Sequence, residues 1–508
     1  MNKTLKNLYG FILRNFIFLI AAAVLVIFSL FIFIATDFFY ELIDNGSIWV
    51  REFFGGFYLW LGFSCVLFLL FIAFSRFGRI RLGNSPPQFN RLSWIAMLYS
   101  AGMGAGILLR AVQEPVFMFI NPPLETGNPP EIIALEYTFY HWGFTAWGFY
   151  GIFALLIAYS LFVKKNTITL GTSLPQFRKI KFLPQAINLL TILTTVFGLV
   201  AAIGLGTTQI EGGISHLTST HPGNTELTLF LVLLICLLAF LSAWAGVEKG
   251  IKKISDWNIM VTIIILMFVF TQADISAVFK EFLQSLFYYL RDFIPMSLAL
   301  GNYDPGKIFL TDWTYYYWAF WLAWAPFTGI FIARISRGRT IREMVLGLLL
   351  IPSLGSFFWF SVFGSTSFDL IDQWGSYHGE FDNVFTSIFM FFETLPFSGA
   401  SNFIIVLLLI GFLVTSVDSA IYVLSMFSDK GRGNPQKKFR LVWALVILIF
   451  SEAIIVLGNI KPESDVLTAM QKLLIISSLP FAFLTAVMML LLLRDLIKTQ
   501  KQAAGKQF

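Results

Sequence analysis

The chain has 508 residues, of which 57% are hydrophobic and 13% are charged, and its mean hydropathy is +0.77. An ordinary soluble domain carries about 25% charged residues, so this composition excludes that class. Apolar windows of about 19 residues recur along the whole length, which predicts a polytopic helical membrane protein. Twelve spans are predicted, near residues 14–36, 57–77, 93–120, 137–163, 187–212, 226–247, 255–273, 313–335, 344–364, 401–427, 438–458 and 469–494.

Basic residues alternate from one connecting segment to the next. Lysines and arginines precede span one and follow spans two, four, six, eight and ten, as Arg76 and Arg79 do after span two. The segment after span three carries Glu125 and Glu131 instead. By the positive-inside rule, both termini are cytoplasmic. The net charge of +6 is the sum of these cytoplasmic segments and needs no nucleic-acid partner.

No linker long enough to separate soluble domains occurs, so we predict one membrane domain. Spans three to seven and spans eight to twelve form two blocks of nearly equal length that start from opposite sides of the membrane, as an inverted repeat requires. The predicted divisions are a cytoplasmic N-terminus with two peripheral helices (1–90), a first five-helix repeat (91–273), an external amphipathic helix and loop (274–312), a second five-helix repeat (313–494) and a short cytoplasmic tail (495–508). Residues 275–296 form the amphipathic helix.

Span three contains a glycine-rich stretch over residues 100–106, with glycines at every second position from Gly102 to Gly106. Each glycine costs a helix about 1 kcal/mol relative to alanine. Broken backbone is tolerated in a membrane only where it lines a cavity or is buried in protein. We therefore expect span three to be interrupted here, with close helix packing through small residues as the alternative.

Aromatic side chains crowd spans four and eight. Residues 313–327 hold nine aromatics, although lipid-facing helices are mostly aliphatic. Span four adds Trp142, Trp147 and Tyr150, which lie at about 0°, 140° and 80° around a helix and so line one half of it. Ring faces attract a quaternary ammonium, which cannot donate a hydrogen bond. We expect a cage for such a cation, with ordinary packing of bulky rings as the alternative.

Three strings are similar to those of the betaine/choline/carnitine transporter (BCCT) family: GMGAG, HWGFTAWGFY and WAFWLAWAPFTGIFIARISRGRTIRE. The resemblance covers spans three to twelve. It implies an all-α polytopic membrane protein with 12 transmembrane helices, in which two extra helices precede a LeuT-like core of two inverted five-helix repeats. It also implies a homotrimer in the bacterial cytoplasmic membrane, surrounded by lipid.

The resemblance implies roles for single aromatic residues. The central ammonium-binding box would consist of Trp142, Trp147, Tyr150 and Trp321, and we refer to these four as the box residues. Two further side chains belong to the substrate path, Trp324 on its cytoplasmic side and Phe320. Betaine carriers have a tryptophan at the position of Phe320, so the π-face is kept here and an indole donor is lost.

Span ten offers hydroxyl groups at Thr415 and Ser416 without a nearby thiol or imidazole, which suits sodium; bonding of the hydroxyls to their own backbone is the alternative. The resemblance implies a sodium site that pairs span ten with the broken span three. Its ligands would be the backbone carbonyls of Ser100, Met103 and Phe412 together with the two hydroxyls.

The resemblance also bears on which ions are carried. Sodium-independent carnitine exchangers place an arginine of span seven in the sodium position, and the aligned residue here is Ile259, which leaves that position open. A second sodium site of some relatives uses three hydroxyls on span five. Thr195 keeps one of them, but the others align with Leu199 and Ala202, so we expect this second site to be weak or missing. No organic cofactor is expected.

Arg110 is the one arginine expected inside span three, and a buried arginine in a span is a functional hypothesis by default. An ion pair with Glu114, four residues later, is the main expectation. Attraction of a substrate carboxylate or an effect on ion coupling is the alternative. Asp418 in span ten is expected to brace backbone near the ion site, and His141 is expected to pack rather than relay protons.

No catalytic Ser/His/Asp arrangement, phosphate loop or pair of catalytic carboxylates occurs, so an enzyme is not expected. The expected function is sodium-coupled transport of a methylated ammonium osmolyte such as glycine betaine by alternating access. One alternative is an antiporter that exchanges sodium or another substrate for a small amine such as trimethylamine. The other is an osmolyte sensor that binds without transport.

Overall fold

A computed structural model describes residues 16–102, 104–166, 169–245, 248–429, 435–460 and 465–504. Throughout that part of the chain the regular elements are helices, and the only extended pairing is an isolated bridge between Arg81 and Thr340. Eleven of the described helices are long and apolar enough to cross a membrane. The protein is therefore an all-α polytopic membrane protein, as predicted.

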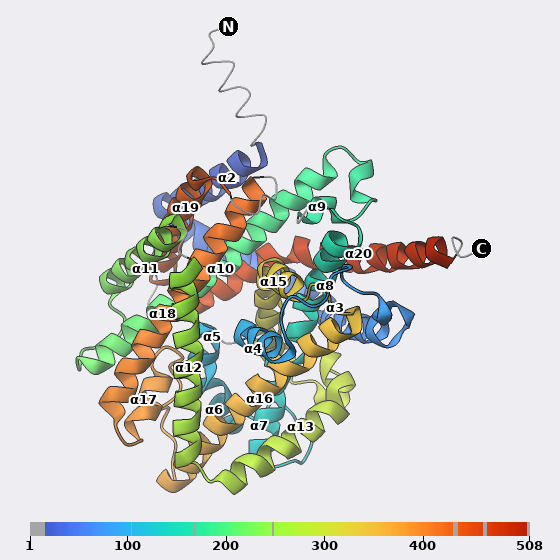
Figure 1. The fold of residues 1–508 in the computed structure, drawn as a ribbon. Coiled ribbons are helices and arrows are strands. Elements are labelled where there is room, and N and C mark those ends of the chain that lie inside the picture. Colours follow the sequence, from blue (N-terminus) through green and yellow to red (C-terminus); the bar gives the residue numbers. More distant parts are fainter. Residues whose placement is uncertain are drawn as a thin grey trace.

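The helices follow the predicted spans closely (Figure 1). In chain order they are α2 (Phe16–Ile34), α3 (Thr36–Phe74), α4 (Arg91–Gly102), α5 (Ala105–Arg110), α6 (Gln113–Ile120), α7 (Pro130–Trp142), α8 (Phe144–Ala158), α9 (Leu170–Ser173), α10 (Leu183–Leu217), α11 (Thr225–Ala245), α12 (Glu248–Gln272), α13 (Ile275–Ser297), α14 (Lys307–Phe309), α15 (Tyr315–Ile335), α16 (Ile341–Trp374), α17 (Ser387–Glu393), α18 (Ser398–Ser428), α19 (Lys437–Gly458) and α20 (Val466–Ala504).

Span three is the exception to the pattern of long helices. It is divided into α4, α5 and α6, with Gly104 in an extended conformation between the first two. The break predicted from the glycine spacing is therefore confirmed. Because none of the three pieces is long enough to count as a membrane span, eleven such helices are found where twelve spans were predicted. The count of twelve and the inverted repeats stay predictions.

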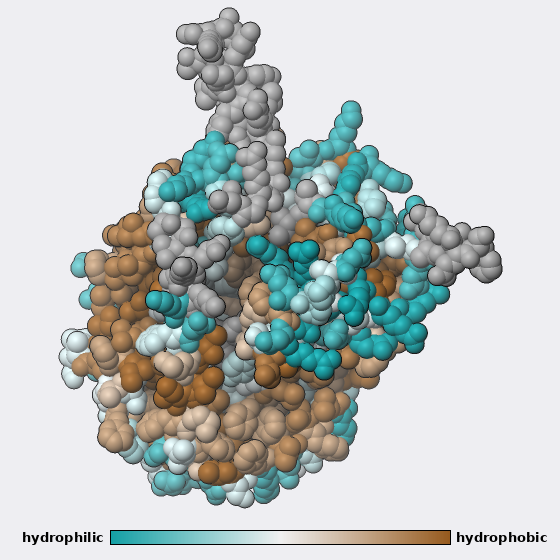
Figure 2. All heavy atoms as spheres, viewed as in Figure 1, coloured by the Kyte–Doolittle hydropathy of each residue, from teal (hydrophilic) through white to brown (hydrophobic). Residues whose placement is uncertain are grey.

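Helices α8 and α15 lie side by side near the middle of the molecule, with α10, α16 and α18 around them (Figure 1). A β-carbon built at Gly329 of α15 would lie 2.6 Å from the Phe153 β-carbon on α8, so only glycine permits this approach. Figure 2 shows hydrophobic residues over the flanks near α11 and α13, and hydrophilic residues gathered near α9 and the C-terminal part of α20. The two aromatic-rich helices are thus central, and lipid contacts fall to other helices.

Span four is also interrupted, at Gly143 between α7 and α8. The Phe144 amide, freed by the break, donates to the Tyr289 hydroxyl of α13 at 2.9 Å. A β-carbon at Gly143 would lie 2.5 Å from the Phe139 carbonyl oxygen, 2.6 Å from the Phe357 ring and 2.7 Å from the Tyr289 hydroxyl. The break therefore depends on glycine and on a helix far away in the sequence.

Helix α13 coincides with the amphipathic helix predicted over 275–296, and its external location stays a prediction. Asp274 caps it by accepting from the Ser276 and Ala277 amides. Its buried face carries Tyr289, and its opposite face carries the exposed apolar side chains Ile275, Phe279, Leu283, Phe287, Leu290 and Ile294. Helix α13 thus braces span four from one side and presents an apolar surface on the other.

Two helices are longer than their hydropathy windows indicate. Helix α3 begins at Thr36 although the apolar window begins at residue 57, and α20 continues to Ala504 although its window ends at 494. Polar contacts stabilise the extra turns: Asp44 pairs with Lys472 at 2.9 Å, and Asp495 pairs with Lys164 at 3.2 Å. A hydropathy window detects only the lipid-facing part of such helices.

We expect Gly143→Ala to lower the free energy of unfolding by about 2 kcal/mol, because the added methyl group overpacks a closed contact. The apparent melting temperature of the purified protein in detergent measures this. Gly56→Ala in α3 is the matched control, since a β-carbon at Gly56 meets nothing within 4 Å. Equal melting temperatures for the two variants would show that span four does not need the break.

Candidate functional site

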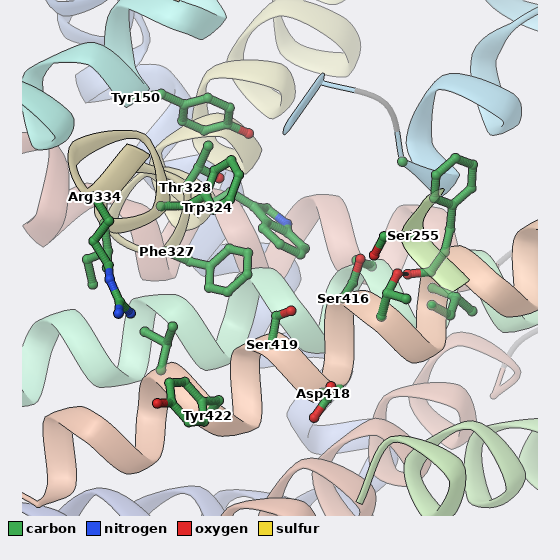
Figure 3. A pocket seen from close by; sticks show the side chains of 18 of the residues that line it. Tyr150, Ser255, Trp324, Phe327, Thr328, Arg334, Ser416, Asp418, Ser419 and Tyr422 are labelled. Carbon is green, nitrogen blue, oxygen red and sulfur yellow. Dashed lines mark hydrogen bonds between the residues drawn. The ribbon is translucent and has the colours of Figure 1, made fainter. Parts of the chain in front are cut away.

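A cavity of about 1730 Å³ lies among the central helices, and Figure 3 shows part of its lining. Helices α5, α8, α10, α12, α15 and α18 all contribute to its wall. Four basic residues line one end, which we call the basic end: Arg334, Arg337, Lys437 and Arg440. At its opposite limit the cavity reaches Leu109 of α5 and Gln209 of α10.

All four box residues line this cavity. The ring centroids are 5.2 Å apart for Trp142 and Trp321, 5.3 Å for Trp147 and Tyr150, and 5.9 Å for Tyr150 and Trp321. Each pair meets edge to face, and all four side chains are buried. The structure therefore brings the residues predicted from spans four and eight together. Their role as the substrate box stays a prediction.

The other two predicted substrate-path residues also line the cavity. The ring centroid of Phe320 is 5.3 Å from that of Trp321 and 6.3 Å from that of Trp324. Figure 3 shows Trp324, Phe327 and Thr328 on α15 opposite Ser419 and Tyr422 on α18. Aromatic faces thus continue from the box residues towards the basic end.

The Glu114 carboxylate accepts hydrogen bonds from three side chains, and we call these four residues the carboxylate cluster. His141 Nδ1 lies 3.0 Å from one carboxylate oxygen, Trp142 Nε1 donates to the other at 3.0 Å, and the Tyr317 hydroxyl donates to that same oxygen. An ionised carboxylate can only accept, so with Glu114 ionised the His141 Nδ1 is the donor of this hydrogen bond. His141 Nε2 lies 3.2 Å from the Thr314 hydroxyl. Glu114 and His141 are fully buried.

The expected ion pair between Arg110 and Glu114 is wrong. The Arg110 guanidinium donates to Gln113 Oε1 at 2.6 Å and lies over the Trp313 ring at 4.8 Å. The i, i+4 rule assumes a continuous helix, but α5 ends at Arg110 and α6 begins at Gln113. The interruption turns the guanidinium away from the carboxylate, whose donors come from spans four and eight instead.

The predicted sodium ligands on span ten share the cavity wall. Phe412, Thr415 and Ser416 all line it. The Thr415 hydroxyl donates to the carbonyl oxygens of Gly411 at 2.9 Å and Phe412 at 3.1 Å, which is the backbone bonding weighed as the alternative. Ser100 lies in the last turn of α4 and its side chain is outside the described residues, as is the whole of Met103. Gly104 and Ala105, just beyond them, line the cavity.

Two polar residues of α12 join this region. Ser255 and Asn258 line the cavity, and Figure 3 draws Ser255 and Ser416 pointing into it from α12 and α18. Asn258 packs against Gly411, where a side chain would collide with its amide oxygen. Asn258 is buried, and within the described parts of the chain neither atom of its amide has a hydrogen-bond partner. Hydroxyl, carbonyl and amide oxygens suit a hard cation, so these residues fit sodium.

Asp418, one turn beyond Thr415 on α18, is buried and lines the cavity towards the basic end. Its carboxylate accepts from the Ser242 hydroxyl of α11 at 3.4 Å. This contact joins α18 to α11 through two side chains, and the predicted bracing of backbone near the ion site stays a prediction.

The sequence model of the betaine/carnitine/choline (BCCT) family of transporters matches residues 16–501. The chain belongs to this family. It is 34% identical to the glycine betaine transporter OpuD of Bacillus subtilis over 92% of both chains. It is 33% identical to the ectoine/hydroxyectoine transporter of Virgibacillus pantothenticus, over 89% of this chain and 90% of the other. It is 32% identical to the osmo-independent choline transporter BetT1 of Acinetobacter baylyi, over 91% of this chain and 89% of the other.

Membership in the BCCT family settles the class of protein: it is a multi-pass membrane transporter rather than an enzyme. Sequence reasoning missed Asn258, Gln209 and the part that Tyr317 takes in the carboxylate cluster. For Asn258 and Gln209 a signal existed, because each is an amide within a predicted apolar span. Nothing in the sequence distinguished Tyr317 from the tyrosines beside it.

We expect Glu114→Gln to lower the free energy of unfolding by about 2 kcal/mol, because the amide leaves one of three buried donors without an acceptor. The apparent melting temperature checks this, with the exposed Glu125→Gln as the control. Tyr317→Phe should lower the melting temperature less in the Glu114→Gln background than in the parent. Additive losses would contradict a shared cluster.

Proposed function

We propose that this BCCT protein is a sodium-coupled secondary transporter of a quaternary or methylated ammonium osmolyte, glycine betaine or a close analogue. The observation that carries the proposal is the meeting of four aromatic rings from spans four and eight on one central cavity. Relatives named as betaine, ectoine and choline transporters support the substrate class. The protein would work in a bacterial inner membrane as a homotrimer.

Recognition of the substrate headgroup rests on ring faces. A trimethylammonium group spreads its charge over methyl groups and offers no hydrogen bond, so the quadrupoles of Trp142, Trp147, Tyr150 and Trp321 are its source of attraction. Each desolvated ring contributes about 0.5–2 kcal/mol. The Trp321 indole nitrogen donates to the His141 carbonyl at 3.0 Å, and that of Trp142 donates to Glu114. Both rings are thus held at a fixed angle before substrate arrives.

Coupling to sodium would use the polar wall opposite the box residues. Sodium supplies a positive charge that holds oxygen ligands of different helices together. Thr415 and Ser416 present hydroxyls from α18, and Asn258 presents an amide oxygen from α12. Gly104 and Ala105 bring the break of span three, between α4 and α5, to the same cavity wall. A bound sodium ion would therefore join α12, α18 and span three, and we expect this association to favour a cavity ready for substrate.

The cavity gives access from one side. It continues from the box residues to the basic end, whereas Glu114, His141 and Tyr317 of the carboxylate cluster do not line it. With the basic end cytoplasmic by the positive-inside rule, this conformation is open to the cytoplasm. Alternating access then requires the contacts among α6, α7 and α15 in the cluster to separate when the outer path opens.

Uptake into proteoliposomes tests the proposed function. Labelled glycine betaine should accumulate with an inward sodium gradient and not with a matched potassium gradient. Thr415→Ala combined with Ser416→Ala should raise the sodium concentration for half-maximal uptake at least tenfold, because two oxygen ligands are lost. If uptake by the parent protein is the same with sodium and with potassium, the proposed coupling to sodium is contradicted. Betaine release driven by external trimethylamine indicates exchange, and saturable binding without uptake indicates a sensor.

We expect Trp321→Leu to raise the dissociation constant for glycine betaine at least tenfold, since leucine has no π-face. Isothermal titration on purified protein measures the constant. Trp60→Leu on α3 is the matched control, because the Trp60 side chain is 59% exposed and does not line the cavity. Unchanged affinity in Trp321→Leu, with an unchanged melting temperature, would remove the box from the proposal.

A further inference from the structure

Gln209 on α10 is a polar residue in an otherwise apolar part of the cavity wall. Its side chain is fully buried and lines the cavity. Neither its amide nitrogen nor its amide oxygen has a hydrogen-bond partner among the residues that the structure describes. Buried polar groups in proteins are nearly always hydrogen-bonded, so an amide left open on both atoms needs a partner that is not part of the chain.

Contacts place Gln209 on the side of the box away from the basic end. A β-carbon at Gly106 of α5 would lie 3.6 Å from the Trp142 ring. Leu109 follows one turn later and packs with Leu205 of α10 in a small apolar cluster. Gln209 follows Leu205 by four residues and therefore lies one turn further along the same face of α10. The amide thus lies on the cavity wall one turn of α10 beyond the contact of Leu205 with Leu109.

The ion site does not account for this amide. Asn258 is the other buried cavity-lining amide without a partner on either atom within the described chain, and it lies against α18 at Gly411, next to the hydroxyls expected to hold sodium. The cavity wall around this part of α10 carries apolar side chains: Leu205 one turn before Gln209, Leu109, which packs with Leu205, and Leu413, which lies against Gly206. A cation would find one amide oxygen and no second ligand among those leucines, whereas an acceptor atom would find an N–H donor.

We propose that Gln209 binds the carboxylate end of the substrate while the ammonium end lies among the box residues. The inference rests on the proposed function and narrows its substrate class to small zwitterions that carry a methylated ammonium and a carboxylate. The amide Nε2 donates to a carboxylate oxygen. A neutral donor in apolar surroundings strengthens this bond without attracting free anions, and it leaves the cationic headgroup to the rings.

Comparing two ligands tests whether Gln209 binds the carboxylate of the substrate. Glycine betaine has both ends, whereas tetramethylammonium has only the headgroup. Isothermal titration of the purified full-length protein with each ligand should show that Gln209→Leu raises the dissociation constant for glycine betaine about tenfold, as loss of one hydrogen bond to a charged group predicts. The constant for tetramethylammonium should stay within twofold of the parent.

Gln209→Glu keeps the shape of the side chain and replaces the donor by a negative charge. It should raise the dissociation constant for glycine betaine more than Gln209→Leu does. It should not raise the dissociation constant for tetramethylammonium. Thr208→Val is the matched control, because Thr208 is the adjacent residue of α10, its hydroxyl bonds the Gly204 carbonyl at 2.9 Å, and it does not line the cavity. Both constants should be unchanged in that variant.

An equal rise in the dissociation constants of both ligands in Gln209→Leu would overturn the inference, because it would show that the amide has a purely structural role. Unchanged affinity for glycine betaine in both Gln209 variants would overturn it as well. If the parent bound neither ligand, the proposed function would fail and this inference with it. If the parent bound tetramethylammonium as tightly as glycine betaine, the headgroup box would stand and the carboxylate contact would not.

Discussion

The central site depends on one buried carboxylate. Glu114 has no exposed surface, and an ion in such a place is costly unless donors surround it. The three donors come from two other spans, His141 and Trp142 from span four and Tyr317 from span eight. Because Trp142 is both a donor to Glu114 and a wall of the cavity, the requirement to satisfy the carboxylate also fixes the angle of a box ring. The hydrogen bond that offsets the cost of burying Glu114 therefore also fixes the orientation of the Trp142 ring.

Two broken helices make this arrangement possible. Span three opens at Gly104 and span four at Gly143, and Trp142 lies directly beside the second break. A continuous helix would turn Trp142 and Trp147 by fixed 100° steps, whereas the break lets each side of Gly143 orient separately. The Phe144 amide released there is satisfied by Tyr289, as backbone within a membrane requires. Through Tyr289, helix α13 thereby stabilises the break beside Trp142.

The sequence predicted the features that depend on local composition and failed where distant residues decide. Apolar windows located eleven long helices because lipid imposes one rule on each of them, and glycine spacing located the break in span three. The break at Gly143 was not predictable, since it needs Phe357 and Tyr289 from other helices. The Arg110–Glu114 pair failed for a related reason: its spacing presumes helix continuity that residues 111–112 remove. The meeting of Trp142, Trp147, Tyr150 and Trp321 at one cavity was predictable, because aromatic side chains are unusual inside a span and their sequence strings resemble those of a known family.

The distribution of charge in the cavity explains how a cation can be held selectively. The charged residues of the described lining, Asp418 and the four basic side chains, lie towards the basic end, and Glu114 has its oxygens occupied by donors. Ring faces are then the main attraction left at the box. A small hydrated ion loses strong water contacts on entering and gains only weak ones from rings, whereas a methylated ammonium is poorly hydrated and loses little. Under the proposed function, sodium would bind the oxygens of α12 and α18 instead, so the two cations would not compete for one place.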